Sequence, residues 1–499
     1  MTHDDRHAAA SAIEAALTDG QFERSVEMVV RPLGDHRFRA ASVDGSVEFR
    51  RDPLNGAWAY SVESTVGRDP LADQATDRFD DLAVEVAALF PHRATNAYPH
   101  AFDSISQVFD SPHAPDLIAT HTAAHHVGGM VGQHGNLGVV QARAPFIAAG
   151  SGVRADGLVD RSTRTVDIAA TVAQLLGVDR HPNGVGPTGE RRGEARLARQ
   201  DGDPDTRVLT GDRADHVVVL LLDGCNANLL RSVIDSGDAP RLASIAGRGT
   251  HYRHGTMASL PTATLANHTT ALTGAHPGHS GIIHNTWFNR ASAEEPDLLD
   301  LGQMFWSSNH IADDVETVFE AIHRTRPDAF TAALFEYADR GATWSSFDVV
   351  RGGAMPDLPG HDELAHADRE ATSASPMYLL GSQVDELSFR HAVELWDGTH
   401  GNPLPDLTWV DVVLTDEAGH ASGPHGELAR QSILDTDARV GDLLQAVEAA
   451  GAFDRTAFVV IGDHGMEQSD PHVDESWEPA LSACGVPVRD VGGGFLYLG

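Results

Sequence analysis

The sequence predicts an α/β fold with a central, mostly parallel sheet and helices on both faces. Three runs support this prediction: residues 216–224 (HVVVLLLDG), 409–420 (WVDVVLTDEAGH) and 456–466 (TAFVVIGDHGM), each rich in Val or Leu before an acidic residue. A continuous apolar run of this length is typical of a strand that is buried on both faces of a parallel sheet. Helical patterns at residues 226–237 and 433–451 alternate with these strands, as the α/β class requires.

The acidic residues at the ends of these strands are expected to meet in one crevice, because open α/β sheets bind ligands outside the carboxyl ends of their strands. Asp223, Asp416 and Asp463 occupy those ends. His420 follows Asp416 by four residues, so one turn of helix directs both side chains the same way, and His464 is adjacent to Asp463. Carboxylates and neutral imidazoles suit Zn²⁺ and, less selectively, Mn²⁺ or Fe. The sequence therefore predicts a metal centre.

A threonine stands at the start of another helical pattern. Residues 259–285 (SLPTATLANHTTALTGAHPGHSGIIHN) contain Thr264, which is followed by a helix start with Asn267 as a possible N-cap. Backbone N–H groups and the helix dipole favour an anion at such a position, so Thr264 can lie beside a phosphoryl group. Taken alone, the same pattern also fits a simple capping hydroxyl.

The chain divides at residues 180–214, a polar stretch rich in Gly, Pro, Arg and Asp that is predicted to be a surface linker. Residues 1–179 precede it and residues 215–499 follow it. In the first of these parts, residues 24–62 alternate with a period of two around Gly and Asp turns. That alternation predicts a small antiparallel β addition to the α/β fold.

The composition limits the partners and the location that we expect. The chain carries 72 acidic and 36 basic residues, a formal net charge of -36, and no lysine. This acidic character argues against binding to duplex nucleic acid or to an anionic membrane. Two cysteines cannot form a disulfide framework, no apolar run is long enough to span a membrane, and the first 20 residues do not resemble a signal peptide. We expect a cytoplasmic protein, with the oligomeric state left open.

Four motifs in residues 216–499 resemble, in this order, those of the nucleotide pyrophosphatase/phosphodiesterase branch of the alkaline phosphatase superfamily. They are LLLDGCN, PTATLANHTTALTGAHPGHSGIIHN, TDEAGHASGPHG and IGDHGM. The resemblance implies an alkaline-phosphatase-like sheet, a small phosphorylated substrate and two divalent metal ions, with Zn²⁺ as the first choice and Mn²⁺ or Fe as alternatives.

The resemblance also implies which side chains hold the two ions. One ion would be held by Asp223, Thr264, Asp463 and His464. The other ion would be held by Asp416, His420 and a further histidine, which the family carries in an HG motif downstream of DHGM, before an RxPF strand and a final helix. Thr264 would be the nucleophile, and Asn285, 21 residues after it, would bind a phosphoryl oxygen.

The further histidine has no counterpart after the DHGM motif. Only 35 residues follow His464, and His472 lacks the strand that should come next. Residues 132–153 (GQHGNLGVVQARAPFIAAGSGV) and the helical pattern at 165–178 resemble the required segment, with His134 as the ligand. The order of segments therefore resembles a circular permutation of the family pattern.

In this interpretation, residues 1–179 correspond to the C-terminal part of the family and residues 215–499 to its N-terminal catalytic part. Both parts would form one catalytic domain, because a fold depends on which surfaces bury each other, and termini that lie close can be joined by an exposed linker. Two consequences are expected. Met1 and Gly499 should lie near each other, and His134 should lie beside Asp416.

The implied activity is the cleavage of phosphodiester or pyrophosphate bonds through a phospho-threonine intermediate on Thr264. The substrate stays open, since Leu265 replaces the aromatic residue that usually follows the nucleophile and Ala266 replaces the usual proline. Phosphonoacetate hydrolysis and phosphomonoester hydrolysis on the same metal site are alternatives. A silent module that binds metal or phosphate is the alternative without catalysis. A sulfatase is disfavoured, because the proline in CGVPVR at Cys484 is one position too late for the C/S-x-P-x-R motif.

Overall fold

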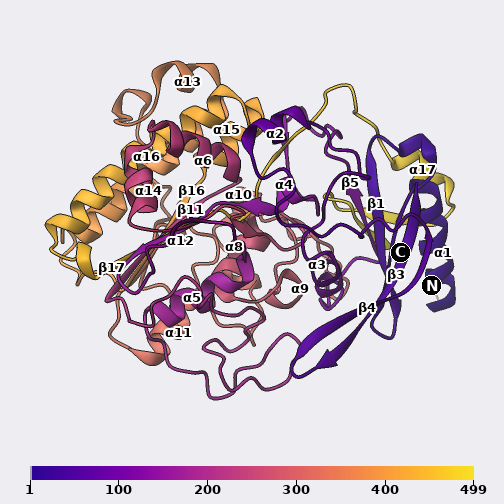
Figure 1. The fold of residues 1–499 in the computed structure, drawn as a ribbon, viewed down its shortest axis with the longest axis horizontal. Coiled ribbons are helices and arrows are strands. Elements are labelled where there is room, and N and C mark those ends of the chain that lie inside the picture. Colours follow the sequence, from indigo (N-terminus) through magenta and orange to yellow (C-terminus); the bar gives the residue numbers. More distant parts are fainter. Residues whose placement is uncertain (1–2) are drawn as a thin grey trace.

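The computed structural model describes residues 3–499, and within them an eight-stranded sheet forms the central layer (Figure 1). In spatial order its strands are β15 (Trp344–Ser345), β14 (Thr331–Leu334), β16 (Leu407–Val412), β11 (His216–Leu222), β17 (Thr456–Ile461), β8 (Phe146–Gly150), β12 (Gly249–Tyr252) and β9 (Gly157–Val159). The strands from β15 to β17 pair in parallel, and β8 pairs antiparallel with both of its neighbours. The predicted α/β fold with a mostly parallel sheet is confirmed.

Helices cover both faces of this sheet, as Figure 1 shows. One face carries α6 (Ala227–Ser236), α7 (Pro240–Gly247), α14 (Pro376–Trp396), α15 (Leu414–Ser422) and α16 (Glu427–Ala449). The other face carries α5 (Ile168–Leu175), α8 (Thr264–Thr273) and α11 (Val318–Thr325). Strand β11 explains the arrangement, because its residues alternate between two hydrophobic clusters: Val217, Val219 and Leu221 pack with one layer of helices, Val218, Leu220 and Leu222 with the other. Its continuous apolar run is thus required by burial on both faces.

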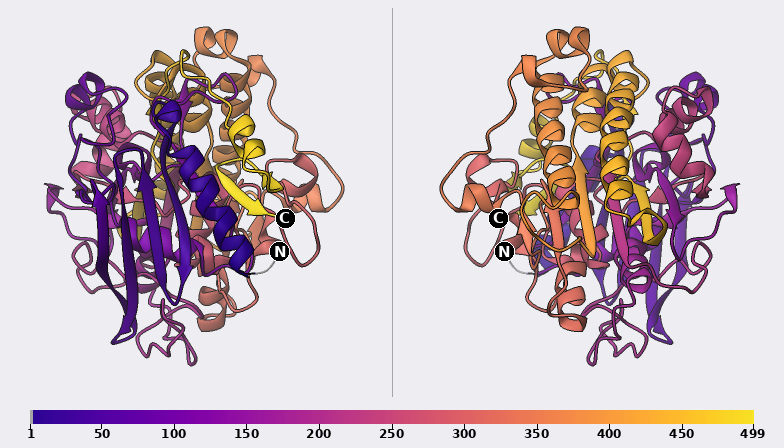
Figure 2. Two further views of the ribbon diagram at one scale, coloured as in Figure 1. Left: turned by 90° about the vertical axis from the view of Figure 1, so that its right-hand side faces the viewer. Right: turned by 90° about the vertical axis from the view of Figure 1, so that its left-hand side faces the viewer.

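The antiparallel addition is also confirmed, and it is larger than predicted. A seven-stranded sheet has the order β19 (Val488–Asp490), β20 (Phe495–Leu498), β5 (Leu117–His121), β1 (Val26–Gly34), β2 (Arg37–Ser42), β3 (Gly45–Leu54) and β4 (Ala57–Gly67). Residues 24–62 contribute most of the last four strands. Helices α1 (His3–Leu17) and α17 (Glu478–Ala483) lie on one face, which is turned towards the viewer on the left of Figure 2. Helix α3 (Ala101–Val108) packs on the other face.

Shorter elements connect these layers. Strand β6 (Gly132–Gln133) pairs with β18 (Glu467–Gln468), and β13 (Thr256–Met257) pairs with both β7 (Arg143–Ala144) and β10 (Thr163–Arg164). The remaining helices are α2 (Leu82–Ala87), α4 (Val139–Ala142), α9 (Pro277–Ser280), α10 (Leu301–Met304), α12 (Asp348–Arg351) and α13 (Arg369–Ala374), with short 3₁₀ turns between them. In the described part of the chain, no helix combines the length and the apolar character that crossing a lipid bilayer requires.

The two ends of the described chain lie close together in the views of both Figure 1 and Figure 2. Arg6 of α1 lies 3.5 Å from a carboxylate oxygen of Asp116, and the other oxygen of Asp116 accepts a hydrogen bond of 2.7 Å from the backbone N–H of Leu498 in β20. One carboxylate thus contacts both the first helix and the last strand. Met1 itself lies outside the described residues.

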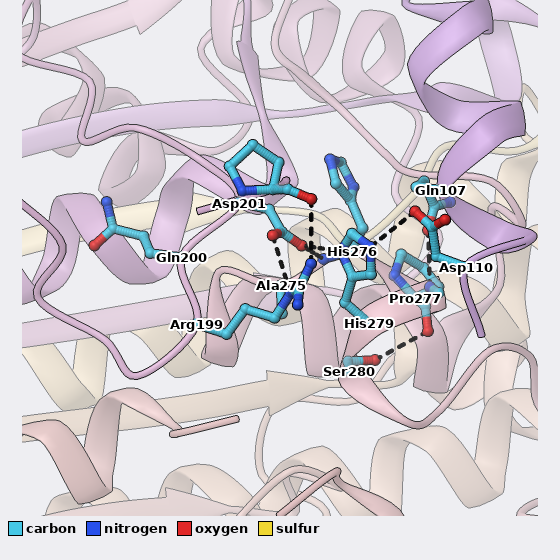
Figure 3. Close-up of polar contacts among 12 residues, drawn as sticks. Gln107, Asp110, Arg199, Gln200, Asp201, Ala275, His276, Pro277, His279 and Ser280 are labelled. Carbon is cyan, nitrogen blue, oxygen red and sulfur yellow. Dashed lines mark hydrogen bonds and ion pairs between the residues drawn. The ribbon is translucent and has the colours of Figure 1, made fainter. Parts of the chain in front are cut away.

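The segment 180–214 is fully described, and it forms neither a helix nor a strand. Polar contacts fasten it to the second part of the chain, as Figure 3 shows. The Asp201 carboxylate accepts hydrogen bonds from the His279 ring (2.6 Å) and from the backbone N–H of His276 (2.8 Å), and Arg199 contacts the same carboxylate. Gln107, from the first part, contacts the same region by accepting a hydrogen bond from the backbone N–H of Gly278 (2.8 Å).

Glu85 on α2 joins the first part of the chain to the second. Its buried carboxylate accepts hydrogen bonds from the side chains of Asn226 (2.6 Å), Asn228 (2.5 Å) and His425 (2.6 Å). Glu85→Ala would remove an acceptor that these three donors share, so we expect the free energy of unfolding to fall by about 2 to 4 kcal/mol. Urea denaturation measures the change. Glu63→Ala, on the exposed strand β4, is the control, and equal midpoints for the two variants would contradict the expectation.

Candidate metal centre

The predicted acidic and histidine residues meet at the carboxyl ends of three adjacent strands. Asp223 follows β11 directly, Asp463 and His464 follow β17, and Asp416 and His420 lie on α15, which begins just after β16. Because β11 pairs in parallel with both β16 and β17, the three strands end at the same edge of the sheet. The strand order alone therefore brings these side chains together.

A glycine next to Asp223 makes the close approach possible. Gly224 has a φ of 58°, in the left-handed region, and a Cβ atom there would lie 2.1 Å from Asp416 Oδ1. Its backbone N–H donates a 3.0 Å hydrogen bond to Asp463 Oδ1. The Asp-Gly pair that ends β11 thus lets two other carboxylates pack against the strand end, which a side chain at this position would prevent.

Three of the predicted ligands lie around His464 Nε2, which is the fourth ligand of this group. This atom lies 3.1 Å from Asp463 Oδ2, 3.3 Å from Thr264 Oγ1 and 3.7 Å from Asp223 Oδ1. All four residues are buried. The arrangement brings together the side chains that the resemblance assigned to one ion.

The other three predicted ligands form a second group. His134 Nε2 lies 3.2 Å from His420 Nε2 and 3.9 Å from Asp416 Oδ1, and His420 Nε2 lies 3.2 Å from Asp416 Oδ2. His134, which comes from residues 1–179, thus lies beside Asp416. The rings of His134 and His464 stack with their centroids 3.9 Å apart, so the two groups are in direct contact.

The three imidazoles are oriented in the same way. The Nδ1 atom of each ring lies 2.8 to 2.9 Å from a backbone carbonyl oxygen: that of Thr262 for His134, Gly132 for His420 and Gly465 for His464. Since a carbonyl only accepts, each Nδ1 carries the proton and each Nε2 faces the centre. This is the tautomer and the orientation that metal-ligating histidines have in proteins.

The unpaired atoms of the centre fit divalent cations. Asp223 Oδ1, Asp416 Oδ1 and Asp463 Oδ2 are buried without a hydrogen-bond partner in the described residues. Leaving a buried carboxylate oxygen unpaired is costly, and a bound cation removes that cost. Within residues 3–499, two groups of three side chains are close enough to hold an ion: His134, Asp416 and His464, and Asp223, His268 and Asp463. The donor set of carboxylates and imidazoles suits Zn²⁺.

Burial and ion pairing together set the charges of the centre, and burial dominates for the first two rings. Burial lowers the pKa of His134 to about 3, assisted by the neighbouring His464, and lowers the pKa of His464 to about 4. Both rings are therefore neutral near pH 7, as metal ligands must be. Burial also raises the pKa of Asp463 to about 6. For Asp416, His420 outweighs the effect of burial and holds the pKa of the carboxyl well below its usual value.

The predicted N-cap of the helix that carries Thr264 was wrong. Asn267 does not cap α8, because the helix begins at Thr264 and its N-cap residue is Ala263, whose side chain cannot accept a hydrogen bond. Asn267 lies inside the helix and bonds to the preceding loop, where its amide nitrogen donates to Pro261 O (2.8 Å). Its Oδ1 also accepts a 2.8 Å hydrogen bond from the backbone N–H of Ser259, so both ends of the amide bond to the preceding loop. Thr264 still occupies the first position of α8, at its N-terminal end.

Asn285 lies next to the nucleophile. Its Oδ1 accepts a 3.0 Å hydrogen bond from the backbone N–H of Leu265, which fixes the amide beside Thr264. Because this contact uses only the oxygen, the Nδ2 group can donate to a phosphoryl oxygen.

The sequence analysis did not identify His268, which lies in the centre one turn after Thr264 on α8. His268 Nε2 is 3.9 Å from both Asp223 Oδ2 and Asp463 Oδ2, and its Nδ1 is 3.0 Å from Glu336 Oε2. Burial alone would lower the pKa of His268, but the carboxylates of Glu336 and Asp411 raise it to about 10. The four-residue spacing from Thr264 was a signal for it, since that spacing directs both side chains to one side of a helix.

A buried acid next to the centre predicts a pH dependence of stability. Burial raises the pKa of Glu467 to about 8, although Gln141 donates a hydrogen bond to it, and Glu27 and Glu85 add to the rise. The folded protein therefore binds a proton that the unfolded chain has released between pH 4.5 and about 8. In this window the free energy of unfolding should fall as the pH rises, by on the order of 1 kcal/mol per pH unit.

Glu467→Gln removes this titration, so urea midpoints measured across the same window should fall less steeply for the variant than for the unchanged protein. Glu448→Gln, at an exposed position of α16, should follow the unchanged protein. Parallel curves for all three proteins would show that Glu467 does not take up the proton.

The chain matches a known family over this region. Residues 217–482 match the family model of type I phosphodiesterase / nucleotide pyrophosphatase, which is more than half of the 499 residues. The chain belongs to this family. The phosphodiesterase match contains seven of the eight predicted site residues, and His134 lies outside it.

Curated members of the phosphodiesterase family are distant relatives. The chain is 23% identical to an uncharacterized pyrophosphatase/phosphodiesterase of Schizosaccharomyces pombe, over 50% of this chain and 44% of that protein. It is 24% identical to ectonucleotide pyrophosphatase/phosphodiesterase 1 of Saccharomyces cerevisiae, over 50% of this chain and 33% of that protein. The chain thus spans less than half the length of these two relatives.

Two solved structures are similar to parts of this phosphodiesterase-family chain. Murine ectonucleotide pyrophosphatase/phosphodiesterase 5 is 20% identical with a TM-score of 0.36, over 52% of this chain and 59% of that chain. Phosphonoacetate hydrolase from Sinorhizobium meliloti 1021, in complex with phosphonoformate, is 20% identical with a TM-score of 0.34, over 51% of this chain and 58% of that chain.

Proposed function

We propose that this protein is a two-metal phosphohydrolase that cleaves phosphodiester or pyrophosphate bonds through a phospho-threonine intermediate on Thr264. The observation that carries the proposal is the position of Thr264 Oγ1, 3.3 Å from His464 Nε2 and at the first residue of α8. A hydroxyl held among metal-ligating side chains at a helix N-terminus is suited to attack a phosphoryl group. Membership of the phosphodiesterase family supports the same reaction class.

The chain would hold two divalent ions, Zn²⁺ first and Mn²⁺ or Fe as alternatives. One set of ligands is Asp223, Thr264, Asp463 and His464, and the other is His134, Asp416 and His420. When bound, such ions lower the pKa of a coordinated hydroxyl and stabilise negative charge on phosphoryl oxygens.

The side chains and backbone of the protein take part in two chemical steps. Thr264 Oγ1 loses its proton to water and attacks phosphorus. The new P–O bond forms as the bond to the leaving oxygen breaks, and that oxygen departs with its electron pair. Water then attacks the phospho-threonine, which restores the hydroxyl and releases the phosphate product. Asn285 Nδ2 and the backbone N–H of Thr264 donate hydrogen bonds to a non-bridging oxygen, where charge develops in both steps.

We also infer that the order of segments is circularly permuted relative to the family pattern. Residues 1–179 would correspond to the C-terminal part of the family and residues 215–499 to its catalytic N-terminal part, joined by residues 180–214. Two contacts support this proposal: His134 lies against His420 and Asp416, and Asp116 contacts both α1 and β20. Both parts would then form one catalytic domain.

A panel of four substrates tests the function. Zinc-loaded protein is assayed with bis-p-nitrophenyl phosphate, the nitrophenyl ester of thymidine monophosphate, p-nitrophenyl phosphate and phosphonoacetate. We expect the two diesters to be hydrolysed fastest. Turnover of phosphonoacetate alone, or of the monoester alone, would replace the proposal with that alternative. Metal binding without turnover of any substrate would indicate a silent module.

Two further points remain predictions: that the substrate is a small phosphorylated molecule, and that the protein is cytoplasmic.

A further inference from the structure

His284 directly precedes Asn285 in the chain, and the proposed function does not use it. Its ring is partly buried, and its Nδ1 accepts a 3.3 Å hydrogen bond from the backbone N–H of Thr286. Because Nδ1 is the acceptor, the proton of the neutral ring is on Nε2. Burial, assisted by the nearby His134, lowers the pKa of His284 to about 4, so the ring is neutral near pH 7.

This tautomer separates His284 from the histidines of the proposed ligand set. In His134, His420 and His464 the proton is on Nδ1, and Nε2 is free to bind a cation. His284 has an N–H group at Nε2 instead, and in residues 3–499 no protein atom accepts a hydrogen bond from it. A group that only donates suits an acceptor such as a phosphoryl oxygen, and it does not suit a metal ion.

A turn of three glycines, residues 492–494, lies against this N–H group. The three glycines lie between β19 and β20, and their φ angles of 90°, 60° and 77° are all positive. A Cβ atom on Gly493 would lie 2.1 Å from His284 Nε2, so only glycine leaves the space beside that atom open. Within the described chain, the backbone N–H groups of Gly493 and Gly494 have no acceptor, whereas that of Gly492 donates to Asp490 Oδ1 (2.9 Å). The glycine turn therefore brings further free donors close to Nε2.

Strand β5 holds the glycine turn near the metal centre. The carbonyl oxygen of Gly494 accepts a 2.9 Å hydrogen bond from the backbone N–H of Ala119, and a Cβ atom on Gly494 would lie 1.9 Å from Ala119 O. Strand β5 ends two residues later at His121, whose Nε2 lies 3.2 Å from the backbone carbonyl oxygen of His134. His284, the glycine turn and the proposed ligand His134 are thus neighbours, although they come from three separate stretches of the chain.

We propose that His284 Nε2 and the glycine turn bind a second phosphoryl group, which the substrate carries next to the attacked phosphorus. This inference rests on the proposed function and names its substrate class, the pyrophosphate type. In the proposed function Asn285 donates to the attacked phosphoryl group. Because Cα atoms of consecutive residues are about 3.8 Å apart, His284 and Asn285 can contact neighbouring groups of one small molecule. Backbone and side-chain N–H donors that lack a protein acceptor suit the oxygens of such an anion.

Rates with two substrates test the proposal on zinc-loaded, full-length protein. ATP carries a second phosphoryl group: attack on its α-phosphorus breaks the bond to the bridging oxygen, pyrophosphate leaves with the electron pair, and water then releases AMP. The nitrophenyl ester of thymidine monophosphate lacks that group. His284→Ala should raise KM for ATP and lower kcat/KM at least about 10-fold, because a hydrogen bond to a charged group is lost. The ester should change less than about twofold, and His284→Gln, which keeps an N–H donor, should recover most of the ATP rate.

A pair of glycine variants tests the same site without changing His284. Gly493→Ala fills the space next to Nε2 and should reproduce the selective loss with ATP. Gly492→Ala is the matched control, since its φ of 90° is also positive but a Cβ atom there meets no other atom within 4 Å. It should keep the kcat/KM of the unchanged protein for ATP. Equal losses for both substrates in Gly493→Ala, or an unchanged ATP rate in His284→Ala, would overturn the proposal.

A binding measurement separates this inference from the proposed function. α,β-Methylene-ADP carries a second phosphoryl group on a bridge that cannot be hydrolysed, and AMP lacks that group. Calorimetric titration of the unchanged protein should show tighter binding of α,β-methylene-ADP, and His284→Ala should remove the difference while it binds AMP unchanged. Equal affinities for the two compounds in the unchanged protein would refute the inference. Failure to hydrolyse any phosphorus ester would contradict the proposed function instead, and the difference in binding would still decide the inference.

Discussion

Thr264→Ala is expected to lower kcat for a phosphodiester by roughly 10³-fold or more, because alanine has no oxygen with which to form the phospho-threonine. Thr264 Oγ1 is the hydroxyl that contacts His464 at the start of α8, and the variant removes only that group. Initial rates with bis-p-nitrophenyl phosphate, at zinc concentrations that saturate both proteins, measure the effect. Thr264→Ser keeps a hydroxyl and should retain part of the activity.

Thr270→Ala provides the control on the same helix. Thr270 is also buried, and its hydroxyl donates a 2.8 Å hydrogen bond to Ala266 O within α8. Its loss should affect stability more than turnover. A rate for Thr264→Ala within about tenfold of the Thr270→Ala rate would exclude Thr264 as the nucleophile.

His134→Ala should have the second-largest effect. The variant removes the only ligand that residues 1–179 supply to the proposed centre, so we expect loss of one of two zinc ions and a fall in kcat/KM of about 10²- to 10³-fold. Metal content by mass spectrometry and diesterase rates at high added zinc separate the two consequences. Partial recovery at high zinc is expected, because Asp416 and His420 remain.

His126→Ala tests whether any histidine of the same segment would have this effect. Its Nδ1 hydrogen-bonds to the Ser469 hydroxyl (2.8 Å). This variant should retain two ions and nearly full activity. Two tightly bound zinc ions in His134→Ala would refute the role of His134 and remove the main support for the permuted order of segments.

Much of the sheet could be predicted because burial on both faces leaves a simple pattern. Strands β11, β16 and β17 are continuous apolar runs, and the acids that follow them mark the edge where the fold class predicts a ligand site. The pair Asp416 and His420 was predictable from a four-residue spacing on one helix. The extent of the antiparallel sheet was not predictable, because β5, β19 and β20 come from three separate stretches whose pairing depends on tertiary contacts.

His268 shows the limit of reading motifs one at a time. Its orienting partner, Glu336, is 68 residues away in sequence, and no local pattern joins them. The wrong assignment of Asn267 as a cap has a related cause, since a cap is inferred from neighbours in sequence, while Asn267 bonds to a loop that folds back over the helix start. Contacts between residues that only the folded structure brings together cannot be recognised in a short stretch of sequence.

Backbone carbonyls orient His134, His420 and His464, and this limits which amino-acid substitutions can disturb the three rings. A main-chain acceptor persists whatever amino acid occupies its position, so no side-chain replacement at Thr262 can delete the oxygen that His134 Nδ1 needs. The path of the backbone therefore sets the orientation of these three rings. Their orientation should tolerate substitutions at the residues that supply the carbonyl oxygens. His268 depends instead on one replaceable carboxylate, which makes it the histidine of this group that a single distant substitution can misalign.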